Sequence, residues 1–320
     1  MESSLVSLFL VLIFLVHGSS YGLTQSRLTV PTAPKCIYFT GAGIYYYWQA
    51  GAAKYIQENC DLSNIPIVGA SAGSLTSSLL FAGVNFDEST SLCIEIAKNR
   101  NLYDGKTGLV GILGELTREW LTRALPTDID MEKFKNMFIS VTPVSPFEKA
   151  TLLTSFTDKA DLIDACLASC HIPFFLDGKA YAVYKDMRLI DGSFNYFLTK
   201  DRYLSLPLPE GVSADEVFWV DYGDDEEFVN SISGNFVELI TPDVAVNMMA
   251  QGYEFMRKEH RDNRMPIANK PYVLSNMISK VTQFPRKVNH FVSSSVESLA
   301  SYSSSPSLLA SSFAMYRNQA

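Results

Sequence analysis

Short apolar runs and helix-like stretches alternate along the first quarter of the chain. Residues 35–40 (KCIYFT) and 65–68 (IPIV) are apolar runs that predict two buried strands. Residues 46–59 (YYWQAGAAKYIQEN) predict a helix between them, and residues 72–82 predict a second helix whose small residues allow close packing on a sheet. The order strand, helix, strand, helix indicates a parallel sheet in an α/β fold.

The rest of the chain continues this mixture of elements. Helices are predicted over 87–99, 108–124, 130–138, 158–169 and 242–261, and strands over 139–144, 150–156, 181–190 and 216–222. Thr157 is placed to cap the helix that begins at residue 158. These elements extend the α/β pattern over most of the chain.

Both ends of the chain have a different composition. Residues 1–22 include an apolar run shorter than the roughly 20 residues of a membrane span, which favours a cleaved signal peptide, with an uncleaved membrane anchor as the alternative. Residues 23–33 are expected to form a linker, or else the start of an organellar transit segment. Residues 291–320 are rich in serine and predict a mobile tail. We therefore expect the secretory or endomembrane system as the location, with membrane association and organelle import as alternatives.

Charge and cysteine content narrow the range of partners. The chain has 34 acidic and 26 basic residues and a net charge of −8, which argues against nucleic acid as a partner and against electrostatic docking on anionic lipid. Five cysteines, at positions 36, 60, 93, 166 and 170, form no C-x-x-C pair, so we expect small buried hydrophobic residues rather than a disulfide or metal site. The sequence predicts no metal and no cofactor, and it identifies no protein partner.

The clearest chemical signal is the segment 69–73 (GASAG). It matches G-x-S-x-G, in which a sharp turn between a strand and a helix exposes a serine nucleophile. Ser71 would then lie at the positive end of the following helix, which favours developing negative charge. The usual base for such a serine is a histidine held by an acid. A histidine-dependent serine hydrolase that uses His171, His260 or His290 is therefore an alternative.

A second candidate base is Asp191, within the segment 188–195 (RLIDGSFN). It follows the apolar end of a predicted strand and precedes Gly192, so its carboxylate is expected at the sheet edge where sites form in α/β folds. An ordinary Asp-Gly turn is the plain alternative. The usual α/β-hydrolase fold fits poorly, because only one predicted strand precedes the strand that leads to Ser71.

Three motifs in this order resemble the signatures of the patatin-like phospholipases: Gly41-Ala42-Gly43, then the segment 69–73, then Asp191-Gly192. The residues at 172–173 (IP) and 251–253 (QGY) are similar to the branch of the family that contains adipose triglyceride lipase. The resemblance implies a three-layer α/β/α fold with a mainly parallel central sheet, in a domain that spans residues 34–290.

The resemblance also implies a mechanism and a substrate class. Members of this family use a Ser–Asp dyad without histidine, which would make Ser71 the nucleophile and Asp191 the base. The oxyanion would be held by backbone N–H groups at Gly41, Ala42, Gly43, Ile44 and Ala72. The motif glycines would be Gly69, Gly73 and Gly192. The expected activity is hydrolysis of carboxylic esters of acylglycerols or phospholipids through an acyl-enzyme, at a membrane or lipid-droplet surface.

Two residues depart from the family pattern. The glycine-rich loop usually ends in glycine, whereas this chain has Tyr46 there, and Ser193 stands where the family has a second glycine or an alanine. If position 46 needs a positive φ or a close backbone approach, tyrosine would strain the loop. The sequence therefore leaves a second reading of function, a catalytically weak relative that binds lipid and has an impaired oxyanion loop.

Overall fold

The computed structural model describes residues 33–104, 108–144, 149–199, 201–232, 239–265 and 267–270. Its strands form one sheet: β1 (Cys36–Phe39), β2 (Ile67–Ala70), β3 (Met137–Pro143), β4 (Thr151–Leu153), β5 (Ala182–Tyr184), β6 (Met187–Ile190) and β7 (Val217–Val220). The order across the sheet is β5-β6-β3-β2-β1-β7, and β4 also pairs with β3. Pairs among β3, β2, β1 and β7 are parallel, and pairs that involve β4, β5 or β6 are antiparallel. The predicted mainly parallel central sheet is confirmed.

Helices cover both faces of this sheet. The helices of the described residues are α2 (Tyr46–Asn59), α3 (Ala72–Phe81), α4 (Phe86–Asn99), α5 (Leu113–Ala124), α6 (Lys159–Ser169), α7 (Phe194–Thr199), α8 (Arg202–Ser205), α9 (Glu226–Ser231) and α10 (Pro242–Arg261). Short 3-10 turns lie between them: η1 (Gly43–Tyr45), η2 (Leu102–Asp104), η3 (Met131–Phe134), η4 (Ala214–Glu216) and η5 (Tyr222–Asp224).

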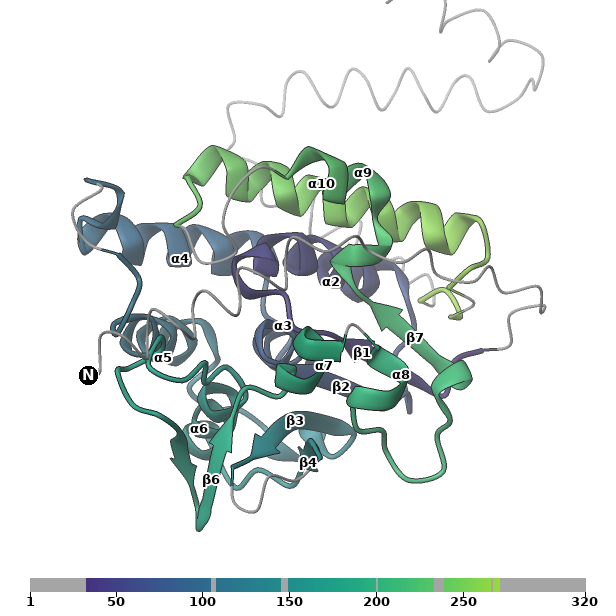
Figure 1. Cartoon of the computed structure of the whole chain (residues 1–320). Helices are drawn as coiled ribbons and strands as arrows, with labels where there is room; N and C mark the ends of the chain where they lie inside the picture. Colours follow the sequence, from purple (N-terminus) through teal and green to yellow (C-terminus); the bar gives the residue numbers. More distant parts are fainter. Residues whose placement is uncertain are drawn as a thin grey trace, which may run out of the picture. The chain divides into compact units, whose positions relative to one another are not determined.

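Alternate residues of the strands face two hydrophobic layers, because successive side chains of a strand point to opposite faces. In β1, Ile37 and Phe39 belong to the large core cluster that contains residues of α2, α3 and α6. Cys36 and Tyr38 belong to a smaller cluster together with Leu206, just after α8. Figure 1 shows α7 and α8 in front of β1 and β2, on the side of the smaller cluster. The three-layer α/β/α arrangement is thus confirmed.

The 20-residue helix α10 packs along α2, and glycines allow their backbones to touch (Figure 1). A Cβ at Gly252 would collide with the backbone of Trp48, and a Cβ at Gly51 would collide with the backbone of Met249. A main-chain neighbour cannot move aside as a flexible side chain can. The close crossing of α2 and α10 therefore depends on the absence of a side chain at these two positions.

The variant Gly252→Ala is expected to destabilise the fold by about 1 to 3 kcal/mol, as overpacking a tight core does. This effect should exceed the gain in helix propensity, which is at most about 1 kcal/mol. Thermal unfolding of the purified protein measures it. Gly108→Ala is the matched control, because a Cβ there meets no atom within 4 Å. Equal melting temperatures for the two variants would contradict the close crossing.

Most predicted elements are present, and α2 and α10 have the predicted bounds 46–59 and 242–261. The helix predicted over 130–138 is wrong, because only the short turn η3 forms there and β3 begins at Met137. The run from Met137 instead pairs in parallel with β2, which buries its apolar residues on the sheet. The strand predicted over 65–68 lies two residues later, as β2.

Three further boundaries differ from the predictions. Helix α5 begins five residues later than expected, because Gly111 adopts a φ of +81° and interrupts the helical path. The strand predicted over 181–190 is a hairpin of β5 and β6, and Lys185 at its turn has a φ of +51°. Asp158, rather than Thr157, caps α6 with its side chain.

Several predictions concern residues that are not described. These are the segments 1–22 and 291–320, nearly all of 23–33, and the end of the predicted domain beyond residue 270. Among the described helices, none is long and apolar enough to cross a membrane. All five cysteines are free, four of them buried and Cys93 partly so, which confirms that they act as small hydrophobic residues.

Candidate active site

Ser71 occupies a strained turn between β2 and α3. Its φ of +53° and ψ of −125° are unfavourable for a residue with a side chain, and such strain costs about 1 to 3 kcal/mol. The turn is held in place because the Ser71 amide donates to Ser169 Oγ at 2.9 Å. The Ser71 carbonyl accepts bonds from the amide of Ser74 at 2.8 Å and from its hydroxyl at 2.7 Å. The Ser71 hydroxyl itself forms no well-formed hydrogen bond with another described residue.

The motif glycines are required by close backbone contacts. A Cβ at Gly73 would collide with the carbonyl of Phe39 in β1, and one at Gly69 would collide with the carbonyl of Gly73. A Cβ at Gly192 would collide with the carbonyl of Ser140 in β3. The contacts at Gly69 and Gly73 bring the start of α3 onto the sheet. The contact at Gly192 brings the Asp191 turn onto β3.

Asp191 follows β6 directly and is only 2% exposed. Its Oδ1 accepts the amide of Ser193 at 2.8 Å, whereas its Oδ2 is buried and has no hydrogen-bond partner among the described residues. Burial raises the pKa of Asp191 from 3.8 to about 6. The Ser71 hydroxyl and the Ser193 amide lower this pKa by less. Ser71 and Asp191 are therefore neighbours, although no well-formed hydrogen bond joins them.

Two serines connect the turn at Ser71 to the turn at Asp191. Ser169, at the end of α6, accepts the Ser71 amide and donates its hydroxyl to the carbonyl of Ser140 at 2.7 Å. Ser140, in β3, donates to the carbonyl of Gly192 at 3.0 Å, and the Gly192 amide donates to the carbonyl of Ser169 at 3.0 Å. These buried bonds fix the relative position of the two turns. Neither serine lies in a motif that the sequence reveals.

The predicted oxyanion loop follows β1. None of the amides of Gly41, Ala42, Gly43, Ile44 and Ala72 donates to another residue in the described part of the chain. Gly43, Ile44 and Ala72 line the same cavity as Ser71, whereas Gly41 and Ala42 do not. Gly41 packs instead against the side chain of Ser193. Free amide donors are what a developing oxyanion needs.

Tyr46 does not strain this loop. Its φ is −43° and it is the first residue of α2, so it has ordinary helical geometry. The positive φ of the loop, +51°, belongs to Gly43. The positive φ that would have strained a tyrosine is therefore not required at position 46, because the loop turns three residues earlier at a glycine.

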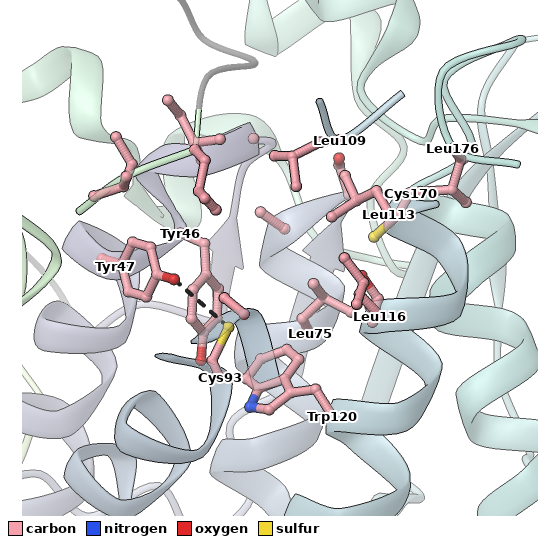
Figure 2. A pocket seen from close by; sticks show the side chains of 18 of the residues that line it. Tyr46, Tyr47, Leu75, Cys93, Leu109, Leu113, Leu116, Trp120, Cys170 and Leu176 are labelled. Carbon is pink, nitrogen blue, oxygen red and sulfur yellow. Dashed lines mark hydrogen bonds between the residues drawn. The ribbon is translucent and has the colours of Figure 1, made fainter. Parts of the chain in front are cut away.

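An apolar cavity of about 160 Å³ adjoins Ser71 (Figure 2). Its walls come from α2, α3, α4, α5 and the segment after α6, with residues that include Tyr46, Leu75, Cys93, Leu113, Leu116 and Trp120. Such a lining excludes water and accommodates hydrocarbon. The arrangement therefore offers a buried serine, a carboxylate and free amides at one side of an apolar space.

The described histidines are engaged elsewhere. His171 is buried, and its Nε2 lies 3.1 Å from the carbonyl of Lys179. Desolvation lowers the pKa of His171, which disfavours its charged form. His260 lies between the hydroxyl of Tyr55, at 3.0 Å, and the carbonyl of Ile267, at 3.1 Å. His290 is outside the described residues. Neither described ring is bonded to Ser71.

No group of three His, Cys, Asp or Glu side chains that could bind a metal ion occurs in the described ranges.

Comparison of the sequence with known protein families identifies the class of protein to which this fold and these motifs belong. The family described as patatin-like phospholipase matches residues 37–198, about half of the chain, and the chain belongs to this family. Human omega-hydroxyceramide transacylase is 27% identical over 168 residues, which are 51% of this chain and 31% of that protein. The human patatin-like phospholipase domain-containing protein 2 is 29% identical over 163 residues, 50% of this chain and 32% of the relative.

A third human relative, a 1-acylglycerol-3-phosphate O-acyltransferase, is 26% identical over 166 residues, 48% of this chain and 32% of that protein. The chain thus matches about a third of the length of these curated relatives. Their names place lipid hydrolases and acyltransferases in the family. The shared region contains the loop at Gly41, the turn at Ser71 and the turn at Asp191.

Proposed function

We propose that the protein is a lipid acyl hydrolase in which Ser71 is the nucleophile and Asp191 is the base. The observation that carries this proposal is the buried, unpartnered Oδ2 of Asp191 beside Ser71, at one side of an apolar cavity. A buried carboxylate oxygen without a partner is costly for a fold to keep. It has a purpose if it accepts the proton of the serine hydroxyl.

The reaction proceeds in two acyl-transfer steps. As Ser71 Oγ attacks the ester carbonyl, Asp191 accepts its proton, and the carbonyl oxygen becomes an oxyanion that amides at Gly43, Ile44 and Ala72 receive. The proton then passes to the departing alcohol, which leaves an ester between the acyl group and Ser71. In the second step Asp191 takes a proton from water as the water oxygen attacks the acyl-enzyme, the bond between the acyl group and Ser71 Oγ breaks, and the proton passes from Asp191 to Ser71 Oγ as the fatty acid leaves.

The lining of the cavity favours a substrate with a long hydrocarbon chain, such as an acylglycerol or a phospholipid. Contact with a lipid surface is supported by Leu198 in α7 and Leu204 in α8, which are 54% and 83% exposed and follow the Asp191 turn. The lipid-binding alternative was based on strain at Tyr46, which instead has an ordinary helical φ.

Hydrolysis is expected to decline as the pH falls through about 6, because Asp191 must be ionised to accept a proton and its pKa is raised to about 6. Below that pH, kcat/KM should fall about tenfold per unit as the ionised fraction decreases. Initial rates on one micellar ester in overlapping buffers measure the profile. A rate that stays constant between about pH 7 and about pH 4.5 would exclude a base with this pKa.

Fatty acid release from a panel of triacylglycerol, phospholipid and galactolipid micelles tests the proposal. Release of fatty acid with water as the only acceptor supports a hydrolase. A product that appears only when a monoacylglycerol or lysophospholipid is added would instead identify an acyltransferase, as the names of two relatives suggest. A folded protein that binds lipid but transfers no acyl group to either acceptor would favour the lipid-binding alternative.

A further inference from the structure

The cavity beside Ser71 has two ends of different character. Cys170 marks the end at the active site, because the carbonyl of the next residue, His171, accepts the Asp191 amide at 2.9 Å, and Cys170 lines the cavity together with Ser71. Figure 2 shows Trp120 and Cys93 at the opposite end, with Leu75 and Leu116 between the two. A chain attached to Ser71 would therefore pass the leucines before it reaches the far end.

Aromatic rings close the far end. Tyr46 meets Trp120 edge to face, with ring centroids 5.1 Å apart, and meets Tyr47 in the same way at 5.5 Å. Because Tyr46 and Tyr47 come from α2 and Trp120 from α5, the contact joins the two helices across the cavity. The rings therefore form a continuous wall.

Hydrogen bonds to α4 hold this wall rigid. The Trp120 indole donates to the carbonyl of Ser89 at 3.0 Å, and the Tyr47 hydroxyl lies 3.5 Å from Cys93 Sγ. The hydroxyl of Tyr46 is buried and forms no hydrogen bond within the described residues. Figure 2 shows this hydroxyl pointing toward Cys93, which lies in α4. The ring of Tyr46, and not its hydroxyl, thus contacts the cavity.

We infer that Tyr46, supported by Trp120, sets the maximum length of the acyl chain that the protein accepts. The inference rests on the proposed function in one respect, that an acyl chain fills this cavity. Each methylene that enters an apolar pocket strengthens binding about fourfold. Once the terminal methyl reaches the ring, a further methylene must displace packed aromatic side chains, which costs more than it contributes. Tyr46 is thus a specificity-determining residue at a position where the family usually has glycine.

Two measurements on the same variants test this inference. The first is kcat/KM for esters of one alcohol with saturated acyl chains of increasing length. The second is the affinity of the Ser71→Ala protein for the corresponding free fatty acids, measured by calorimetry. We expect kcat/KM of the parent protein, and the fatty acid affinity of its Ser71→Ala form, to rise with acyl-chain length up to a limit and to fall beyond it.

Shortening the side chain of Tyr46 should raise the maximum acyl-chain length. In Tyr46→Ala the limit is expected to lie about two to four carbons higher, because the space left by a large-to-small change stays largely open. Tyr46→Phe keeps the ring and should restore the limit of the parent. Tyr46→Leu serves in place of the alanine variant if that protein does not fold, and its limit should rise by a smaller number of carbons.

A matched control makes the same change on the same helix, away from the cavity. Tyr55 is buried in α2 against Tyr253, with ring centroids 5.2 Å apart, and does not line the cavity. Tyr55→Ala should reduce stability comparably and leave the length limit unchanged. An unchanged limit in Tyr46→Ala, or an equal change in Tyr55→Ala, would overturn the inference. Length-dependent fatty acid binding by a parent that cleaves no ester would refute the proposed function and leave the length limit testable by binding.

Discussion

Replacing Ser71 by alanine is expected to reduce ester hydrolysis by about 10⁴- to 10⁶-fold, because the acyl-enzyme can no longer form. The amides of the oxyanion loop and the apolar cavity remain, so some activity above the uncatalysed rate can persist. The Ser71 hydroxyl has no well-formed hydrogen bond with a described residue, so its removal should leave the fold intact, apart from the strain that any side chain experiences at a φ of +53°. Fatty acid release and thermal unfolding, measured on one preparation, separate the two effects.

Ser78→Ala is a suitable control for this variant. Ser78 is a buried serine of the same helix α3, and its hydroxyl donates to the carbonyl of Ser74 at 2.8 Å, away from the cavity. Its loss should lower stability by about 1 kcal/mol and keep activity within a few-fold of the parent. If Ser71→Ala retained the activity of this control, the serine mechanism would be excluded.

The fold was predictable where local signals agree with the tertiary environment. Helix α10 begins at Pro242 after a threonine, and its amphipathic spacing continues for 20 residues, so both ends could be placed from sequence. The segment 130–138 failed because Asp130 caps only the short turn η3. Whether the next apolar run becomes helix or strand was decided by pairing with β2, which is distant in sequence.

The candidate site likewise contains residues that the sequence could identify and residues that it could not. Ser71 and Asp191 lie in short motifs whose residue types reflect their chemistry, so sequence could propose them. Ser140 and Ser169 have no such signal, because one lies in an apolar strand and the other at a helix end among small residues. Their role arises only when β3 and α6 meet beside the two turns. The helix predicted over 46–59 already included Tyr46, but the sequence did not show that the positive φ of the loop falls at Gly43.

The site keeps two features that cost stability, the backbone strain at Ser71 and the desolvated carboxylate of Asp191. With a pKa of 3.8 in the unfolded chain and about 6 in the folded protein, ionising Asp191 costs the native state about 3 kcal/mol at pH 8. This penalty is absent below the unfolded pKa, develops as the pH rises from about 3.8 to about 6, and is constant above that, because the folded state holds its proton longer.

Asp191→Asn is therefore expected to abolish hydrolysis and to raise the melting temperature at pH 8. The side-chain amide hydrogens of the asparagine are left unpaired, which offsets part of the gain in stability. The remaining stabilisation is about 1 to 2 kcal/mol, or roughly 2 to 6 °C in melting temperature. The difference from the parent should shrink as the pH is lowered below about 6, where the parent carboxyl becomes neutral. Differential scanning calorimetry across this range measures both melting temperatures.

Asp221→Asn is the matched contrast. Asp221 is as buried as Asp191 but accepts the hydroxyl of Tyr196 at 2.7 Å and lies 3.5 Å from Arg202, so this substitution should destabilise the protein. If Asp191→Asn melted below the parent at pH 8, the desolvation penalty at Asp191 would be refuted, and if it kept the hydrolytic activity of the parent, Asp191 would not be the base.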